Sequence, residues 1–492
     1  MNLIKSSLVF KLLNKLDIQE NSFFQQIVQE SFFIKKLNNF LEQTQVKFSE
    51  ISKTSNLIKI IDYIILGLIS LILISIPFLE TKIIGFFTAV GFAVLLIKFC
   101  CVKGEKHYFN SFDIPIFLYI LIAGLSVTFS SFFIPSIKGY IKILIYFGGY
   151  LTFINIFKNH PKRIIYLMVL LTITVSIEAF YAIYQQITGI EPLAAWQDRT
   201  EVNPELLMNR VYGSLKPYNP NLLGGYLVAG FSSALGTAFL FLNRKKFIFS
   251  FLSFIGVAAV LLAILFTGSR GVYIATAAMI GVFMIISGHI IWHEFNQIKW
   301  LKKFWMFLGI FGLISLIALV LFSPALQHRI LSIFAFRGDS SNSFRFNVYF
   351  ACIKIFLDNW LTGIGTGNNT FRLVYGLYMT TGFDALGSYN IFLEIAVESG
   401  IFALLSFIWL ILLSFISGIK YFVKNNSLEN KIIVSSCLIG IAGLMVHGFF
   451  DTIWYRPQVN LIFWMLIAIL AIIISGNIYT SPKETKPKTD FS

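Results

Sequence analysis

The amino-acid sequence predicts an all-α protein, a polytopic membrane helix bundle of about twelve transmembrane helices with a large outer loop that carries short helices. Composition is the first observation: 57% of the residues are hydrophobic, 13% are charged, and phenylalanine occurs 53 times. Soluble globular chains carry about 25% charged residues, so lipid is the solvent for most of this chain. The second observation is the recurrence of apolar stretches of spanning length, and the third is the placement of lysine between them.

Apolar stretches of about 20 residues are candidate spans, because a helix rises about 1.5 Å per residue through about 30 Å of hydrocarbon. The boundary near residues 267–271 is weak, since only "TGSRG" separates two apolar runs, and the 140–157 stretch is short enough to be tilted or interfacial. The expected spans lie near residues 60–78, 83–101, 113–133, 140–157, 164–187, 221–241, 247–267, 271–291, 304–322, 388–418, 432–449 and 458–476.

The chain divides into three parts. Residues 1–58 are amphipathic, with Lys11, Lys15, Lys35 and Lys36 beside leucine and phenylalanine, and they lack the apolar core and cleavage site of a signal peptide. We expect either surface helices on the cytoplasmic leaflet or a solvated cytoplasmic extension. The membrane domain covers residues 59–478, and residues 479–492 form a polar cytoplasmic tail.

Lysine predicts the orientation. The formal net charge of +15 favours basic cytoplasmic loops over nucleic-acid binding, because alternate loops between the spans are rich in lysine. Both termini are then cytoplasmic, in an inner (plasma) membrane, and the long loops near 188–220 and 323–387 face the periplasm. The expected inner lysines are Lys98, Lys103, Lys106, Lys158, Lys162, Lys245, Lys246, Lys299, Lys302, Lys303, Lys420, Lys424, Lys431, Lys483, Lys486 and Lys488.

Arginine shows the opposite bias, which topology signals do not explain. The guanidinium is a planar fork that stays charged when desolvated, so it suits carboxylate and phosphate recognition. We therefore expect an outward-facing anion site, with ordinary ion pairs to Glu201, Glu205, Asp339 and Asp384 as the alternative. The arginines outside or at the outer boundary are Arg199, Arg210, Arg270, Arg329, Arg337, Arg345, Arg372 and Arg456.

Arg270 is the sharpest case, because it stands in "LFTGSRGVYI" between two apolar runs. An arginine at such a depth needs an anion, a carboxylate or backbone carbonyls as its partner. The candidate carboxylates are Glu178, within one span, and Glu394 and Glu398, which share one helix face. His447, near the outer end of a span, is expected to be a hydrogen-bonded interior histidine.

The second outer loop is long enough to carry structure of its own. "SFRFNVYFACIKIFLDNWLTGIG" predicts a helix that lies on the outer membrane surface, ends at Gly363 and has Arg345 in its first turn, with N-cap candidates in Ser340–Ser343. The face expected to be apolar consists of Phe346, Tyr349, Phe350, Ile353 and Phe356. The chain has no Walker loop, no CxxC and no HExxH, so the sequence predicts neither a cofactor nor a metal.

Several segments together resemble the O-antigen ligase/polymerase superfamily, and within it a cyanobacterial branch named for bicarbonate transport, the IctB type. They are "RVYGSLKPYNPNLLGGYL", "TGSRG", "NSFRFNVYFACIKIFLDNWLTGIGTGNN", "YNIFLEIAVESG" and "WYRPQVN". The resemblance covers essentially the whole chain. It implies a twelve-helix bundle with a large outer loop between the ninth and tenth spans.

In the ligases, the resemblance implies, outer arginines bind the pyrophosphate of an undecaprenyl-linked glycan and a histidine assists transfer to an acceptor sugar. Carried over, the arginines fall on Arg210, Arg270 and Arg345. Asn221, Asn390 and Arg456 stand in the same resembling segments and are further candidates for anion or pyrophosphate binding. The histidine position falls on Tyr389, a departure from the ligases, because tyrosine with its usual pKa near 10 is a poor base at neutral pH.

Two functions from different classes follow. One is a transport-associated protein of the IctB type, involved in inorganic carbon accumulation with bicarbonate at the arginine site. The other is a glycosyltransferase that uses polyisoprenyl-pyrophosphate glycans in cell-surface polysaccharide assembly. Both place an anion on the outer arginines, with membrane lipid as a partner, and Tyr389 weighs against the enzyme. In either case Arg210 and Asn221 are expected to approach Arg270 and Tyr389.

Overall fold

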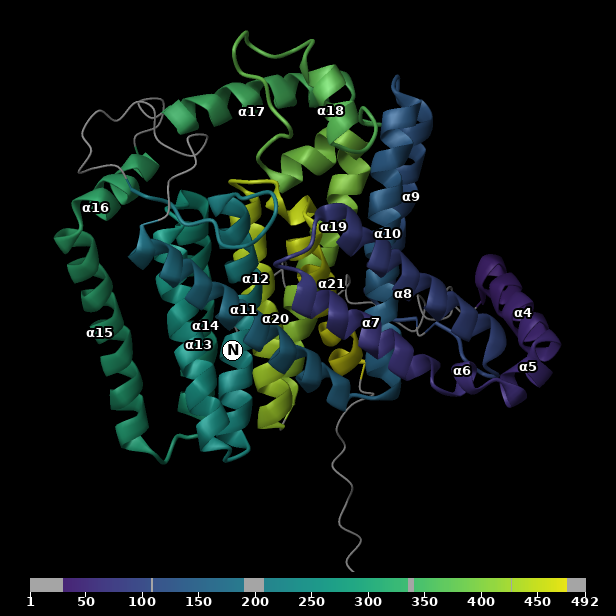
Figure 1. Ribbon diagram of the computed structural model, residues 1–492, viewed down its shortest axis with the longest axis horizontal. Helices are drawn as coiled ribbons and strands as arrows, with labels where there is room; N and C mark the ends of the chain where they lie inside the picture. The colour runs from purple at the N-terminus through teal and green to yellow at the C-terminus, as the bar shows by residue number, and fades with distance from the viewer. Residues whose placement is uncertain (1–29, 108, 190–207, 335–339, 426, 476–492) are drawn as a thin grey trace, which may run out of the picture.

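The computed structural model describes residues 30–107, 109–189, 208–334, 340–425 and 427–475 (Figure 1). Within these ranges the chain is all-α and contains no strand, which confirms the predicted fold class. Each expected span forms a helix. These helices are α7 (Ile61–Ser75), α8 (Thr81–Cys101), α9 (Asp113–Phe129), α10 (Phe133–Asn159), α11 (Lys162–Thr188), α12 (Pro220–Asn243), α13 (Phe247–Phe266), α14 (Arg270–His293), α15 (Lys299–Phe322), α19 (Ile391–Lys424), α20 (Leu428–Gly448) and α21 (Pro457–Ile474).

Ten of the described helices are long and apolar enough to cross a membrane, and α7 and α9 are shorter apolar helices. The two doubtful places in the sequence have clear outcomes. α13 ends at Phe266 and α14 begins at Arg270, so "TGSRG" does separate two helices. The span expected at 140–157 was drawn too short, because α10 begins at Phe133; its polar first turns, which include Lys138 and Lys142, hide that start from a hydropathy window.

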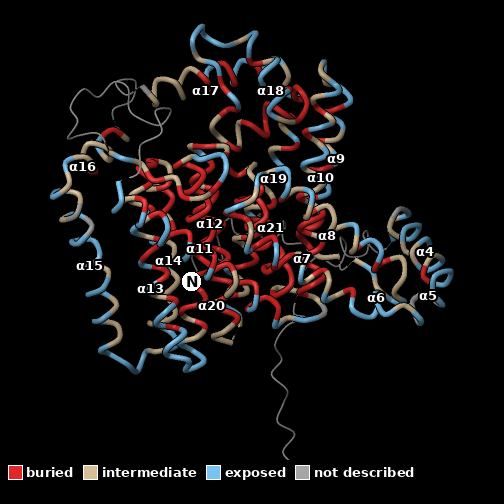
Figure 2. The backbone as a smooth tube through the Cα atoms, in the orientation of Figure 1, coloured by how far each residue is buried: buried red, intermediate tan, exposed pale blue. Residues whose placement is uncertain are grey.

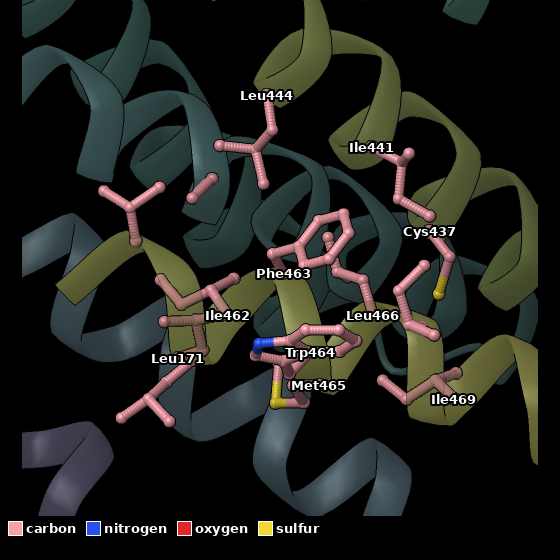
Figure 3. Packing of buried hydrophobic residues seen from close by; sticks show 14 of the residues in the cluster. Leu171, Cys437, Ile441, Leu444, Ile462, Phe463, Trp464, Met465, Leu466 and Ile469 are labelled. Carbon is pink, nitrogen blue, oxygen red and sulfur yellow. The ribbon is translucent and has the colours of Figure 1, made fainter. Parts of the chain in front are cut away.

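The last helix, α21, lies at the centre of the bundle, where it packs against α10, α12, α19 and α20 (Figure 2). Phe463 and Trp464 stack edge to face, with ring centroids 5.1 Å apart, among Cys437 and Ile441 of α20 (Figure 3). Helix association in lipid depends on close packing rather than on water release. The buried core around α21 is therefore the part of the bundle that fixes the other helices.

α15 stands apart from this core (Figures 1 and 2). It packs only on α14 and α16 among the strong helix contacts of the described residues, and large apolar side chains such as Phe307, Phe311 and Ile314 are exposed. In a bilayer such side chains face hydrocarbon, so their exposure is not a defect. Its position leaves the loop that follows α15 free to fold back over the bundle.

The two ends of the bundle differ in charge. At one end α12, α14 and α20 meet through Arg244–Glu429, with a nitrogen–oxygen distance of 2.6 Å, and through Lys431–Glu294. At the other end α16 (Pro324–Leu331), α17 (Ser340–Asp358) and α18 (Asn368–Tyr375) lie over the bundle (Figure 1). We call this end the loop side.

The expectation for α17 is wrong in three respects. Ser340–Ser343 lie inside its first turn, Arg345 lies in its second turn, and the helix ends at Asp358, before Gly363. The buried face is Val348, Ala351, Cys352 and Ile355, while Phe350 and Ile353 are exposed. The helix packs on α18 and α19, so small and β-branched side chains fill that contact, and the larger apolar side chains point away.

The N-terminal segment is described from residue 30 onward, so Lys11 and Lys15 lie outside the described residues. It forms α4 (Phe32–Lys47), α5 (Ser49–Thr54) and α6 (Asn56–Lys59). The Gln45 side chain is buried: its Nε2 donates to the Phe99 and Glu105 carbonyls, each at 2.8 Å, and its Oε1 accepts from Gly104 N at 2.9 Å. α4 is therefore docked on the end of α8 and is not a free extension. The tail 479–492 lies outside the described residues.

Candidate functional site: an arginine cluster on the loop side

The polar loop before α12, residues 208–219, is held down by two side chains of α11. Glu178 accepts hydrogen bonds from Ser214, at 2.6 Å from the backbone N and 2.7 Å from Oγ. Gln185 accepts from Gly213 N at 2.8 Å and donates to Gly213 O at 3.2 Å. Gly213 has a φ of 65° and lies directly against the Glu178 carboxylate, where a side chain would overlap it. The recorded hydrogen bonds of the Glu178 carboxylate thus hold the loop in place, and none of them comes from an arginine.

The anchored loop places Arg210 against "TGSRG". Its Nε donates to Thr267 O at 2.8 Å, and its Nη2 donates to Asn221 Oδ1 at 2.7 Å. Asn221 in turn donates from Nδ2 to Asp451 Oδ2 at 3.0 Å. Gly268, with a φ of 60°, lets the turn pass beside the Arg210 side chain. The polar loop before α12 and "TGSRG" therefore lie together, as expected.

Two more arginines lie nearby: Arg329 reaches the same turn, and Arg270 reaches Ser332. Arg329 of α16 donates from Nε to Gly268 O at 2.7 Å. Arg270, at the start of α14, donates from Nη1 to the backbone O and to Oγ of Ser332, both at 3.1 Å. Backbone carbonyls are thus among the partners of both guanidinium groups.

The fourth arginine, Arg345, comes from α17 above the bundle. Its Nη1 donates to Ser341 Oγ at 3.1 Å, while its Nε is buried and has no hydrogen-bond partner among the described residues. We call Arg210, Arg270, Arg329 and Arg345 the arginine cluster.

The arginine cluster concentrates positive charge. Burial, the largest cause, and the charges of Arg329, Arg345 and Arg270 together lower the pKa of the Arg210 guanidinium to about 9. Tyr273 is the neighbour that opposes this shift. Like charges that crowd together at a membrane boundary are costly unless an anion joins them. The first turns of α12 and α14 also point their free N–H groups to this end, which favours negative charge.

Tyr389 lies beside the cluster but not as a base. Its φ is 54°, its ring packs edge to face on Phe344 at 5.6 Å between centroids, and burial raises its pKa to about 12. The phenol therefore stays protonated at neutral pH. The Tyr349 hydroxyl lies 3.2 Å from Tyr389 O and 3.3 Å from Phe449 O, which ties this turn to the end of α20.

Asn390 has a structural place. Its Oδ1 caps α19 by accepting from Phe392 N and Leu393 N, both at 3.0 Å, and its Nδ2 donates to Phe449 O at 3.3 Å. The side chain thus joins the start of α19 to the end of α20.

Other residues proposed from the sequence lie elsewhere. Arg456 is a charge neighbour of Tyr146 on α10, and Arg372 pairs with Asp384 at 3.4 Å on the surface. Glu394 accepts from Ser388 N, and Glu398 is a charge neighbour of Lys142, so neither of these recorded contacts joins them to Arg270. Arg199, Glu201, Glu205, Arg337 and Asp339 lie outside the described residues.

Sequence reasoning missed Asp451 and did not predict the unpartnered nitrogen of His447. Asp451 supplies the carboxylate that Asn221 links to Arg210. The expectation that His447 is hydrogen-bonded is wrong at one atom, because its Nε2 is buried without a partner among the described residues. The spacing in "HGFFD" could have suggested the pair, since residues four apart on a helix end lie on one face.

These features define a polytopic membrane protein in which four arginine side chains lie at one end of the helix bundle. Residues 255–408 match the sequence profile of a family described as O-antigen ligase. The matched region includes Arg270, Arg329, Arg345 and Tyr389, so this part of the chain is similar to that family. No curated protein matches it.

Proposed function

We propose that the arginine cluster binds the pyrophosphate of a polyisoprenyl-linked glycan and that the protein transfers this glycan to an acceptor. One observation carries the proposal: Arg210, from the loop before α12, has three arginines from α14, α16 and α17 as charge neighbours. Pyrophosphate has several negative charges and accepts bidentate hydrogen bonds, so it matches such a set. The match to the O-antigen ligase family supports the same substrate class.

Charge favours pyrophosphate over bicarbonate as the occupant. Bicarbonate carries one negative charge and leaves most of the cluster uncompensated, whereas a pyrophosphate diester compensates more of it. Involvement in bicarbonate accumulation remains the alternative function. It draws support from Tyr389, because a phenol with a pKa of about 12 does not take a proton from an acceptor hydroxyl at neutral pH.

The test is donor binding by purified protein in liposomes, with a fluorescent polyisoprenyl-pyrophosphate oligosaccharide as the probe. We expect Arg270→Ala to weaken binding at least about tenfold, because a charge-assisted contact contributes about 1.5–3 kcal/mol. Arg270→Lys is expected to restore little, since an ammonium lacks the planar fork.

Arg372→Ala is the matched control, because Arg372 is an exposed arginine of the same loop side and pairs with Asp384. Equal donor binding by native protein, Arg270→Ala and Arg372→Ala would contradict the proposal. Bicarbonate uptake into the same liposomes that is lost in Arg270→Ala, together with absent donor binding, would establish the alternative.

A further inference from the structure

The proposed transfer needs a group that takes a proton from the acceptor hydroxyl, and the structure places an imidazole where Tyr389 cannot serve. His447 stands one residue before the end of α20, on the loop side, and is 3% exposed. Its recorded charge neighbours are Asp451 and Arg345. His447 therefore lies beside both the arginine cluster and the Asn221–Asp451 link.

The His447 ring lies close to two glycines. A Cβ atom on Gly225 of α12 would lie 3.3 Å from His447 Cε1, and one on Gly271 of α14 would lie 3.4 Å from His447 Cδ2. The next ring atom from a Cβ on Gly225 is Nδ1, at 3.5 Å, so the Cε1–Nδ1 edge of the ring faces α12 and Cδ2 faces α14. The first turn of each helix carries a residue of the proposed site, Asn221 on α12 and Arg270 on α14.

The same Nε2 has no hydrogen-bond partner among the described residues, although it is buried. A buried nitrogen without a partner costs free energy, so such an atom in a native structure calls for a ligand or a role. Here the unpartnered nitrogen belongs to a ring that has Asp451 and Arg345, a member of the arginine cluster, as charge neighbours. A ligand bound there would supply the missing partner.

We propose that His447 Nε2 is the proton acceptor of this site and takes the proton of the acceptor hydroxyl during glycan transfer. The acceptor oxygen forms a bond to the anomeric carbon of the glycan, and its proton moves to Nε2. The bond from the anomeric carbon to the pyrophosphate oxygen breaks, and the polyisoprenyl pyrophosphate leaves with the electron pair, compensated by the arginine cluster. Asp451 stabilises the imidazolium that forms. This assignment rests on the proposed function.

The charged and titratable groups around the ring are known element by element. Asp451 follows α20 and Arg345 approaches from α17, while α12 and α14 present Gly225 and Gly271 to the ring. One acidic and one basic group are thus the recorded charges around the imidazole. A pH dependence of transfer that belongs to His447 should disappear when the imidazole is removed and these neighbours remain.

The experiment compares native protein with His447→Gln and His447→Ala in liposomes, each checked for equal thermal stability. The probe is a polyisoprenyl-pyrophosphate oligosaccharide that serves as its own acceptor. Donor binding and release of polyisoprenyl pyrophosphate are measured separately between about pH 5 and 8, the range in which histidine titrates. We expect both variants to bind donor like the native protein and to lose transfer about 10²-fold or more. The rise of the native rate with pH is lost as well.

Added imidazole gives a second readout that is independent of folding. We expect it to restore transfer in His447→Ala, which vacates a space between Gly225 and Gly271, but not in His447→Gln. Native-like transfer with an unchanged pH profile in His447→Gln overturns the assignment of His447 and leaves the proposed function intact. Absence of transfer by native protein overturns both the assignment of His447 and the proposed function. If donor binding is absent as well, the failure lies in the proposed role of the arginine cluster.

Discussion

At the scale of single residues, the proposed site depends on two side chains, Tyr389 and His447. Tyr389 stands at the position where the ligases that this chain resembles carry a histidine, and burial raises its pKa to about 12. His447 approaches the same turn from α20, and Tyr349 connects the two places through Tyr389 O and Phe449 O. A base can thus be lost from one segment and supplied from another, provided that both segments meet at the bound substrate.

The first prediction concerns Tyr389→His. A histidine at this position titrates near pH 6.5 and accepts a proton at neutral pH, which the phenol does not. It also tolerates the φ of 54° at position 389 better than most residues do. We expect transfer from a polyisoprenyl-pyrophosphate donor to rise, and to rise most, by about 10²-fold, in a His447→Gln background that has lost its own base.

Tyr389→Phe is the control, because it keeps the ring packing on Phe344 and removes only the hydroxyl. Its transfer rate should equal that of the native protein. A large loss in Tyr389→Phe would mean that the phenol contributes directly, and the prediction would be wrong.

At the scale of helices, the arginine cluster depends on the close approach of α12 and α14. Gly224 of α12 faces Val272 of α14 so closely that any Cβ on Gly224 would overlap Val272 Cγ2. The absence of a side chain at Gly224 thus permits this close approach. One turn away, the same approach brings Asn221 and Arg210 to the start of α14, so helix packing and site geometry have one origin.

The second prediction follows from that contact. We expect Gly224→Ala to destabilise the bundle by about 1–3 kcal/mol, the usual effect of an extra methyl group in a packed interior. The change is measured as a lower thermal unfolding temperature in detergent. Val272→Ala in the same chain should recover part of the loss, because it removes the methyl groups that overlap.

Gly281→Ala is the matched control, since a Cβ at Gly281 of α14 would have no atom within 4 Å. It should leave the unfolding temperature unchanged or raise it slightly, as alanine favours helix more than glycine does. Equal losses in Gly224→Ala and Gly281→Ala would show that helix propensity rather than the contact with Val272 decides the effect.

At the scale of the whole molecule, charge separates the two ends of the bundle. At one end, lysines form ion pairs with carboxylates: Lys431 with Glu294, and Lys98 with Asp62 at 2.8 Å. The arginine cluster lies at the other end, beneath α16 and α17. This separation agrees with basic loops retained in the cytoplasm and a substrate site on the far side of the membrane.

The third prediction is the orientation. We expect both termini in the cytoplasm and residues 323–387 in the periplasm. Phosphatase, which is active only in the periplasm, and a fluorescent protein that folds only in the cytoplasm are fused in turn after Ser492 and within that loop. Phosphatase activity after Ser492 would reverse the orientation and place the arginine cluster in the cytoplasm.

Much of the fold was predictable from the sequence alone. Apolar length identifies spans such as α13 and α14 on either side of "TGSRG", because each helix satisfies its own backbone and must cross the same hydrocarbon thickness. The wrong start of α10 and the wrong face of α17 have one cause. Polar first turns and mixed apolar faces are sorted by what each helix packs against, and a sequence window does not contain that neighbour.

The sequence also determined that arginines gather on one side of the membrane, because residue type and loop parity suffice for that inference. Only the tertiary structure decided which of them meet. Arg270, Arg329 and Arg345 become charge neighbours of Arg210, whereas Arg456 lies beside Tyr146 and Arg372 pairs with Asp384. Only the structure, too, placed the His447 ring beside Gly225 and Gly271 and left its Nε2 without a partner among the described residues. The physical reason is that such contacts join residues up to hundreds of positions apart, as in Asn221–Asp451, and helix packing alone sets their distances.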